Sequence, residues 1–409
     1  MRNSSVLTLL ICCHTARAFV GGPSSTRRCP HLSIKRPNSI DFTLHSFFGD
    51  ASSTIMEDLS FVSPDTTGIG EQACVDAARE MKRIAVPISK EISPSGSVGI
   101  SYIHWPANSK KKNALPLILL HGFDSSCLEY RRLGPQLASR GIDTFAVDIL
   151  GWGFTQLSDI TDFSANSKVE ALNSFVNANF GPSTPFVVAG ASLGGAAAIE
   201  LASASTTCAG LVLIDAQGFV DGVGPMASLP KPLAQLGVGV LKSVPLRNMA
   251  NKMSYYDVEQ FATEEAQVIG RLHCLRDGWS DAMVSFMRTG GFSPSSKISK
   301  VTAPALVLWG RQDGILDGKE FANKFVEELP NAQLQWIEEC GHVPHLEQPE
   351  ETAAAIASFL TSTATKSASN GRTNLVDGRV EEEISPSTYY VGGGIIGAMV
   401  LEELIKQFF

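Results

Sequence analysis

The chain has 409 residues, of which 44% are hydrophobic and 18% are charged, so it can bury a large core. This composition excludes an intrinsically disordered chain and a miniature fold held together by disulfides. The 33 Lys and Arg against 41 Asp and Glu give a formal net charge of −8. Because the only basic run of the body is the three lysines at 110–112, we expect no nucleic-acid partner.

Signals for metals, disulfides and cofactors are missing from the sequence. The eight Cys are scattered and show neither paired metal-ligand spacing nor a disulfide framework. No glycine-rich phosphate loop and no dinucleotide fingerprint occur. We therefore expect a reduced protein without a metal or a cofactor, and the sequence specifies no oligomeric state.

Residues 1–60 have the composition of a targeting presequence. An apolar run at 6–13 follows Arg2, and a small-x-small site follows at 16–18, as in a secretory signal peptide. The next segment, 19–40, is rich in Ser, Arg and Pro and contains no acid, which is typical of a transit peptide. This pairing resembles the two-part presequence of plastid proteins in algae whose plastid has extra membranes. We expect plastid targeting, with secretion as the alternative.

Strand and helix patterns alternate along the body of the chain. Short apolar runs predict strands at 117–120, 144–147, 185–188, 211–214, 305–308 and 334–337. Helical spacing of apolar residues predicts helices at 125–140, 169–180, 193–204, 319–329 and 351–360. Buried strands separated by helices require crossovers, so the sequence predicts an α/β fold with a mostly parallel sheet flanked by helices.

The body and the C-terminal end divide into four parts. The core comprises 61–222 and 301–363, and the interruption at 223–300 reads as an inserted helical cap. Residues 364–388 are polar and predict a flexible linker. Residues 389–409 begin with thirteen uncharged residues, fewer than a spanning helix needs. This end is either a membrane-interface segment or a terminal helix that packs on the body.

The motif Gly190-Ala191-Ser192-Leu193-Gly194 lies where a predicted strand meets the predicted helix at 193–204. A nucleophile at such a junction needs a sharp turn with glycine two residues to either side, because a Cβ would crowd the neighbouring elements. The motif alone is a weak signal, but it occurs once in the chain and at the required kind of junction. The sequence therefore predicts Ser192 as a nucleophile, with Gly190 and Gly194 as structural residues of the turn.

A serine nucleophile needs a base, and the base needs an orienting acid, because a free hydroxyl is too weakly acidic to attack an ester. His342 follows the last predicted strand, and Asp313 follows the strand before it. Both loops are at the carboxyl ends of parallel strands, where open α/β sheets place ligands. The chain order Ser192, Asp313, His342 is the order that such sheets use for a catalytic triad.

The base and the acid each have an alternative. His345 is the second candidate base, although we expect it to pack or hydrogen-bond in the loop. Asp215 ends the strand at 211–214 and could reach the histidine in place of Asp313. Asp317 is a third carboxylate, but its position at a predicted helix start is explained by capping.

Two backbone N–H groups are predicted to stabilise the oxyanion. One belongs to Leu193 and the other to Phe123, in the loop after the first long strand. In the same loop we expect His121 to have a structural role. Asp124 either borders the pocket or caps the helix that follows, and we expect the cap.

Five segments together resemble the α/β-hydrolase superfamily over about residues 85–363. They are His121-Gly122, the run 148–153, the serine turn, 310–313 and 341–347. The resemblance implies Ser192 as nucleophile, His342 as base and Asp313 as orienting acid. Dehalogenase and epoxide-hydrolase members carry an Asp nucleophile, so Ser192 argues against both activities.

Two stretches are similar to a plastid-targeted subgroup of plants and algae within this superfamily. They are residues 121–131, from His121 to Arg131, and residues 270–275. Nearby plastid hydrolases act on phytol and chlorophyll esters. The polar tail and its apolar end depart from the usual pattern of the superfamily.

The cap carries most of the information on the substrate. Its stretch 232–241 is apolar and uncharged, and an apolar stripe at helical spacing, which cap-to-core packing explains, consists of Trp279, Met283, Phe286 and Met287. Arg271, His273 and Arg276 either contact a carboxylate or face solvent, and we expect solvent. An apolar cap over the edge of the sheet that carries the candidate triad favours a hydrophobic acyl or prenyl ester as substrate over a sugar or a nucleotide.

These observations predict a serine esterase or lipase-like hydrolase that works through an acyl-enzyme. Two alternatives remain open. One is a ligand receptor or carrier that keeps the site for binding, and the other is a carbon–carbon bond hydrolase with the same triad.

Overall fold

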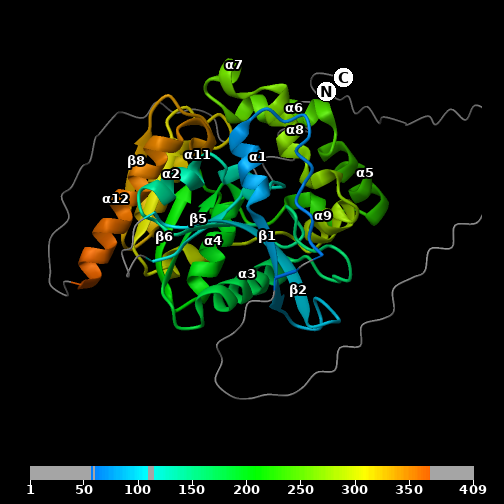
Figure 1. The fold of residues 1–409 in the computed structure, drawn as a ribbon, viewed down its shortest axis with the longest axis horizontal. Coiled ribbons are helices and arrows are strands. Elements are labelled where there is room, and N and C mark those ends of the chain that lie inside the picture. The colour runs from blue at the N-terminus through cyan, green and yellow to red at the C-terminus, as the bar shows by residue number, and fades with distance from the viewer. Residues whose placement is uncertain (1–56, 59, 109–114, 369–409) are drawn as a thin grey trace, which may run out of the picture. The chain divides into compact units, whose positions relative to one another are not determined.

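The computed structural model describes residues 57–58, 60–108 and 115–368. Eight strands form one sheet in the order β1-β2-β4-β3-β5-β6-β7-β8 (Figure 1). β2 pairs antiparallel with β1 and β4, and all other pairings are parallel. The strands are β1 (Met81–Pro87), β2 (Ser97–Trp105), β3 (Leu117–Leu120), β4 (Thr144–Val147), β5 (Phe186–Ala191), β6 (Cys208–Ile214), β7 (Ala305–Gly310) and β8 (Ala332–Ile337).

Helices cover both faces of the sheet (Figure 1). One face packs against α3 (Ala165–Phe180), α4 (Leu193–Ala204) and α10 (Gly318–Glu328). The other face packs against α1 (Gln72–Arg79), α2 (Leu133–Ser139) and α12 (Pro349–Ala368). Among the described residues, no helix is both long enough and apolar enough to cross a bilayer.

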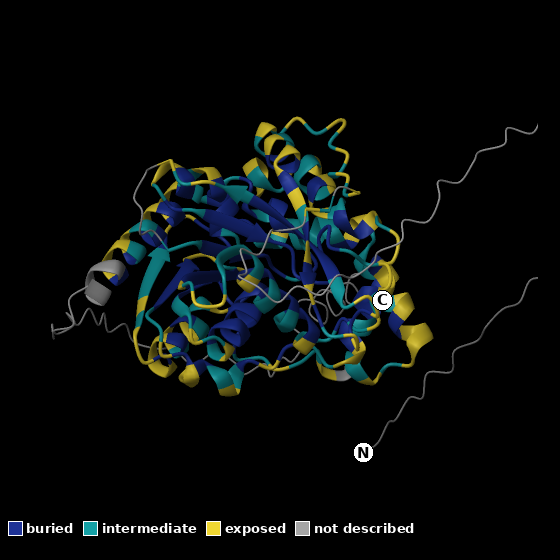
Figure 2. Ribbon diagram, turned by 60° about the horizontal axis from the view of Figure 1, so that its bottom comes forward, coloured by how far each residue is buried: buried dark blue, intermediate teal, exposed yellow. Residues whose placement is uncertain are grey.

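The central strands are apolar throughout because both of their faces are covered. In β3, Ile118 and Leu120 belong to the core on one face, whereas Leu117 and Leu119 belong to the core on the other. This alternation is the period of two that strand geometry imposes. Figure 2 shows the result as a sheet whose central strands are buried along their length. The predicted α/β fold with a mostly parallel sheet is confirmed.

The segment between β6 and β7, which contains the predicted cap at 223–300, consists of short helices. Its helices are η2 (Gly224–Ser228), α5 (Lys231–Leu241), α6 (Val244–Ser254), α7 (Val258–Phe261), α8 (Glu264–Arg271), η3 (His273–Leu275), α9 (Trp279–Arg288) and η4 (Ser295–Lys300). The stripe on α9 packs inward: Trp279, Met283, Phe286 and Met287 are all buried.

Only the helix predicted at 193–204 has the predicted bounds, and the helices predicted at 125–140 and 351–360 differ most from the structure. The helix expected at 125–140 is divided into η1 (Cys127–Tyr130) and α2. Pro135 explains the division, because it has no N–H for the carbonyl four residues earlier and fits only the first turn of a helix.

The last helix, α12, runs to Ala368, beyond the expected end at residue 360 and into the predicted linker at 364–388. Residues 361–368 contain neither Gly nor Pro, so nothing in them stops the helix. The remainder of the predicted linker, the segment 389–409 and residues 1–56 lie outside the described residues. The short helix α11 (Pro344–Glu347) precedes α12.

Candidate active site

Ser192 occupies a strained turn between β5 and α4. Its φ of 50° lies in the left-handed region, where a residue with a side chain costs about 1–3 kcal/mol. A Cβ on Gly190 would overlap the Gly194 carbonyl, and a Cβ on Gly194 would overlap the Leu120 carbonyl. The two glycines therefore allow the close approach of strand, turn and helix that the serine turn requires.

His342 and Asp313 are brought together by the loops after β8 and β7. The His342 Nδ1 donates to Asp313 Oδ2 at 2.8 Å, and both side chains are buried. Asp313 Oδ1 also accepts the backbone N–H groups of Ile315 and Leu316, at 2.8 and 3.1 Å. Burial opposes ionisation of Asp313, but the charge and hydrogen bond of His342 outweigh it and lower the pKa of the carboxyl group.

The other nitrogen of His342, Nε2, is buried and has no hydrogen-bond partner among the described residues. No hydrogen bond joins it to Ser192 in this part of the chain. Both residues are at the carboxyl edge of the sheet, since Ser192 follows β5 and His342 follows β8. Catalytic hydrogen bonds are often long before substrate binds, so Nε2 is the nitrogen left to receive a proton.

Asp215, the alternative acid, follows β6 and lies beside this pair. Its Oδ1 accepts the Gly310 N–H at 2.9 Å, while Oδ2 has no hydrogen-bond partner in the described residues. Burial and the charge of Asp313 raise the pKa of Asp215 well above its ordinary value. Ionisation is therefore favoured at Asp313, next to His342, and opposed at Asp215.

The three side chains also have the spacing of a cation site. One ligand atom from each of Asp215, Asp313 and His342 lies within 4.8 Å of the others. A divalent ion would require an ionised Asp215 in a fully buried position, where burial opposes ionisation, and Nδ1 of His342 is already bonded to Asp313. Two carboxyl groups and an imidazole joined to one of them by a hydrogen bond therefore describe these three residues better than a metal site does.

The loop after β3 lies against the serine. A Cβ on Gly122 would be 3.4 Å from the Ser192 Cβ. Glu129 accepts the Gly122 N–H at 3.1 Å, which fixes the loop just before Phe123. Leu193 is the first residue of α4, where N–H groups have no partner within the helix. The two predicted oxyanion amides thus come from elements that flank Ser192.

His121 has the structural role that the sequence predicts. Its Nε2 is 3.1 Å from the Ile149 N–H, which can only donate, so the proton of the ring is on Nδ1. Nδ1 donates to the Gly122 carbonyl at 2.9 Å. Burial lowers the pKa of this fully buried imidazole. His121 therefore links two loops as a neutral side chain.

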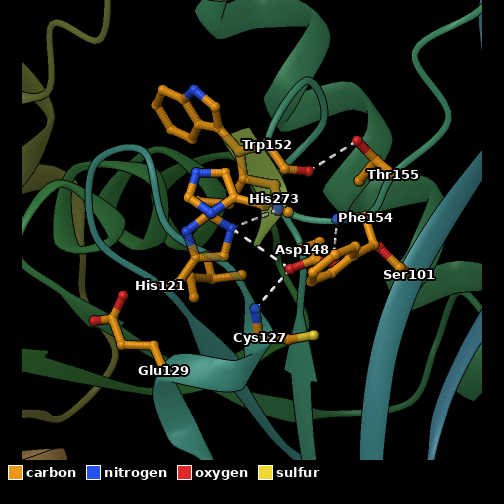
Figure 3. Close-up of polar contacts among 12 residues, drawn as sticks. Ser101, His121, Cys127, Glu129, Asp148, Trp152, Phe154, Thr155 and His273 are labelled. Carbon is orange, nitrogen blue, oxygen red and sulfur yellow. Dashed lines mark hydrogen bonds and ion pairs between the residues drawn. The ribbon is translucent and has the colours of Figure 1, made fainter. Parts of the chain in front are cut away.

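Asp148 is a structural residue of the site whose contacts the sequence did not predict. It accepts the backbone N–H groups of Cys127 at 2.6 Å and Phe154 at 2.8 Å, and the Ser101 hydroxyl (Figure 3). Gly153 follows nearby, where a Cβ would overlap the Asp148 carboxylate. The only signal in the sequence was the run 148–153, which supported the resemblance to a superfamily without indicating these partners.

Asp124 does not cap a helix, and this prediction is wrong. Its buried carboxylate accepts His273 Nε2 at 2.9 Å, Trp279 Nε1 at 2.7 Å and the guanidinium of Arg247. Burial opposes its ionisation, but Arg247 and His273 outweigh burial and lower the pKa of Asp124 to about 2. Three cap elements thus converge on the residue after Phe123.

The prediction that the basic residues at 271–276 face solvent is also wrong. His273 is buried against Asp124, Arg271 donates to the Lys242 carbonyl, and Arg276 donates to the carbonyls of Gly153 and Thr155. Buried carboxylates and carbonyls need donors, and these side chains supply them from the cap.

The two remaining alternatives have structural explanations. His345 is buried, and its Nε2 is 2.8 Å from Glu129 Oε1. Burial opposes the ionisation of Glu129, but His345 holds its pKa at about 2. Asp317 caps α10 by accepting the N–H groups of Lys319 and Glu320, as predicted.

Comparisons with known proteins identify the family of this chain. The sequence model described as "Alpha/beta hydrolase family" matches residues 117–355. "Alpha/beta hydrolase domain-containing protein VTE7" of Arabidopsis thaliana is 34% identical over 305 residues, which are 73% of this chain and 89% of that protein. "Lipase 1" of Psychrobacter immobilis is 27% identical over 253 residues, which are 60% of this chain and 76% of that lipase.

A solved esterase from Thermogutta terrifontis has the same fold. Its TM-score is 0.56 at 20% identity, and the match covers 69% of this chain and 98% of the esterase. The family and its lipase relatives support hydrolase activity on esters. The chain belongs to the alpha/beta hydrolase family, in which it has a plant relative.

Proposed function

We propose that this protein is a serine hydrolase of hydrophobic carboxylic esters. The Ser192 Oγ attacks the ester carbonyl carbon while His342 Nε2 takes the hydroxyl proton. Asp313 holds the imidazole and stabilises the imidazolium that forms. The N–H groups of Phe123 and Leu193 stabilise the negative charge on the carbonyl oxygen.

The reaction is completed in two proton transfers. The imidazolium of His342 protonates the leaving alcohol as its bond to the acyl carbon breaks, which leaves an acyl group on Ser192. His342 then takes a proton from water as the water oxygen attacks the acyl carbon. Release of the carboxylic acid restores the Ser192 hydroxyl.

One observation carries this proposal. The imidazole of His342 is bonded to Asp313 at 2.8 Å through Nδ1, and its Nε2 is buried without a partner among the described residues. This arrangement leaves a base oriented and available at the sheet edge where Ser192 sits in a strained turn.

A hydrophobic acyl or prenyl group is the substrate that the surroundings favour. An aromatic chain runs from the proposed oxyanion loop to the cap: the Phe123 and Trp152 ring centroids are 5.7 Å apart, and those of Trp152 and Phe286 are 4.9 Å apart. Trp152 and Phe286 are buried, so apolar side chains surround the proposed oxyanion loop, and such surroundings favour an apolar ligand. The lipase among the relatives supports the same substrate class.

The experiment is labelling with a fluorophosphonate probe, followed by turnover on short, long and prenyl esters. Ser192→Ala should abolish labelling and lower turnover by several orders of magnitude. Ser203→Ala is the matched control, because this hydroxyl lies on the same helix and donates only to the Glu200 carbonyl among the described contacts. Retained turnover in Ser192→Ala excludes the mechanism.

The same assay separates the alternatives. Tight ligand binding without turnover across the ester panel indicates a receptor or carrier. Cleavage of vinylogous diketones in preference to esters indicates a carbon–carbon bond hydrolase with the same triad.

We also propose that residues 1–60 direct the protein to a plastid. The basis is their composition, an apolar signal-like run followed by an acid-free segment rich in Ser, Arg and Pro. A fluorescent protein fused behind residue 60 should coincide with chlorophyll fluorescence in algal cells. Its appearance in the medium indicates secretion instead.

A further inference from the structure

Helix α5 of the cap is apolar except for Lys231 and Gln235. Its inner side, with Ala234 and Val238 buried, packs against α9. Its outer side is exposed: Leu233 is 53% accessible to solvent and Leu236 is 68% accessible. Exposed leucines on one side of a helix normally pack in a core or contact lipid, so the outer side of α5 is unexplained by the fold.

The outer side of α5 is also open. A Cβ placed on Gly237 or on Gly239 would meet no atom within 4 Å. Figure 1 shows α5 at the right-hand edge of the cap, with α9 on its inner side. The described residues therefore leave this side of the helix without a partner.

The charge around α5 differs from that of the whole chain. Residues 222–256 contain no Asp or Glu, and their basic residues are Lys231, Lys242, Arg247 and Lys252. This stretch carries four positive charges in a chain whose formal net charge is −8. Lys231 begins the helix and Lys242 follows it, so the cations flank an uncharged outer face. Apolar faces flanked by lysine are typical of helices that bind anionic lipid.

The position of α5 links this surface to the candidate active site. The next helix, α6, donates from Arg247 to Asp124, beside Phe123. At the other end of α6, the Ser254 carbonyl accepts the His342 N–H at 2.8 Å. One helix therefore separates the outer face of α5 from both the proposed oxyanion loop and the loop of the proposed base.

We propose that the outer face of α5 docks on an anionic lipid surface. The helix has 11 residues, which span about 16 Å, so it would lie along the interface with Leu233 and Leu236 in the apolar layer. Lys231 and Lys242 would face the anionic headgroups. The docking is independent of catalysis, whereas its use, to take a hydrophobic ester from the lipid, rests on the proposed function.

The test measures how the full chain partitions onto vesicles of phosphatidylcholine with and without phosphatidylglycerol. The docking variant combines Leu233→Ser with Leu236→Ser. The matched control combines Val62→Ser with Val326→Ser, two exposed apolar residues outside the cap that are 84% and 36% accessible. Both proteins keep residues 1–60 and 389–409, so any binding through these segments is common to them.

The docking variant should bind phosphatidylglycerol vesicles at least about tenfold more weakly than the control, which should match the wild type. Wild-type binding should weaken with added salt, because Lys231 and Lys242 attract the headgroups through a screened field. Equal partitioning of the two variants overturns the proposal, as does equal binding to the two vesicle types. A dimer in solution that the docking variant dissociates also overturns it, because the face would then pack against a second copy.

Measuring turnover of a short soluble ester tests catalysis separately from docking. The docking variant should hydrolyse the soluble ester at the wild-type rate and lose turnover only on an ester presented in anionic vesicles. A wild-type rate on the soluble ester also shows that the variant is folded. If no ester is hydrolysed and vesicle binding still depends on Leu233 and Leu236, the result supports the docking surface and contradicts the hydrolase proposal.

Discussion

The Asp124 carboxylate accepts a hydrogen bond from Trp279 Nε1 at 2.7 Å, across 155 residues of sequence. The bond joins the loop that contains Phe123 to α9 of the cap. Asp124 has a φ of 49°, a strained value for a residue with a side chain, which persists because Arg247, His273 and Trp279 all hold it. The cap therefore fixes the residue next to a proposed oxyanion amide.

Asp124→Asn should lower both activity and stability. The substitution leaves Arg247 without its buried partner, so the free energy of unfolding should fall by about 3 kcal/mol. A shift of the Phe123 amide should lower kcat by about 10- to 100-fold with a smaller change in KM. Steady-state kinetics on a soluble ester and denaturant unfolding measure the two effects.

The control for this change is Asp281→Asn, an exposed residue on the same helix as Trp279. It removes the same charge without touching the network and should leave kcat and stability at the wild-type level. If Asp124→Asn behaves like this control, the cap does not position the loop.

Asp313→Asn and Asp215→Asn should have very different kcat values, although the two carboxyl groups are neighbours. Asp313 is the charged partner of His342, so its amide should lower kcat by about 10⁴-fold, because the imidazole is then held in the wrong tautomer. Burial and the charge of Asp313 oppose the ionisation of Asp215, so an uncharged amide of the same shape should keep kcat within about tenfold. The measurement is kcat for both variants at one pH. The reverse ranking would show that Asp215 is the orienting acid.

Glu129 should make the stability of the protein dependent on acid pH. Its pKa is lowered from 4.5 to about 2 in the folded chain, so the ionised form stabilises the fold fully above about pH 5. That stabilisation is lost as the pH falls toward 2, when the folded protein also takes up the proton. The variant Glu129→Gln lacks this titration. The wild type should therefore be more stable than the variant at pH 7, and its advantage should shrink between pH 5 and pH 2.

Urea unfolding at several pH values measures this difference. Glu351→Gln is the control, because Glu351 is exposed on α12 and its removal should not change the pH dependence. A difference between wild type and Glu129→Gln that stays constant over this range would contradict the assignment.

Local signals in the sequence were sufficient for the central strands and for the serine turn. The helix at 193–204 was predicted to the residue, because a glycine-bounded serine separates a strand pattern from an alanine-rich helix. The order of Ser192, Asp313 and His342 followed from the ends of parallel strands. The strand β1 was not predicted, because its pairing with β2 is set by the fold and its apolar residues do not form a continuous run.

The polar network between the core and the cap could not be predicted. Asp124 lies 149 residues from His273 in sequence, and Arg276 lies 123 residues from the Gly153 carbonyl that it binds. From local sequence alone, a single acid after a strand predicts a helix N-cap, and basic residues in a helical segment predict exposure to solvent. Their true partners depend on how the inserted cap folds over the sheet, for which neither stretch carries a local pattern.

The serine turn should tolerate no side chain at Gly190, whereas a helical glycine elsewhere should accept one. Gly190→Ala places a Cβ on the Gly194 carbonyl, so the backbone must shift and stability should fall by about 3 kcal/mol. Gly270→Ala in α8 meets no atom within 4 Å and should stabilise the protein by about 0.5–1 kcal/mol, because alanine loses less backbone entropy in a helix. Thermal unfolding of both variants measures the effect as shifts of opposite sign. Equal shifts would mean that the close contact between Gly190 and Gly194 does not constrain the turn that carries Ser192.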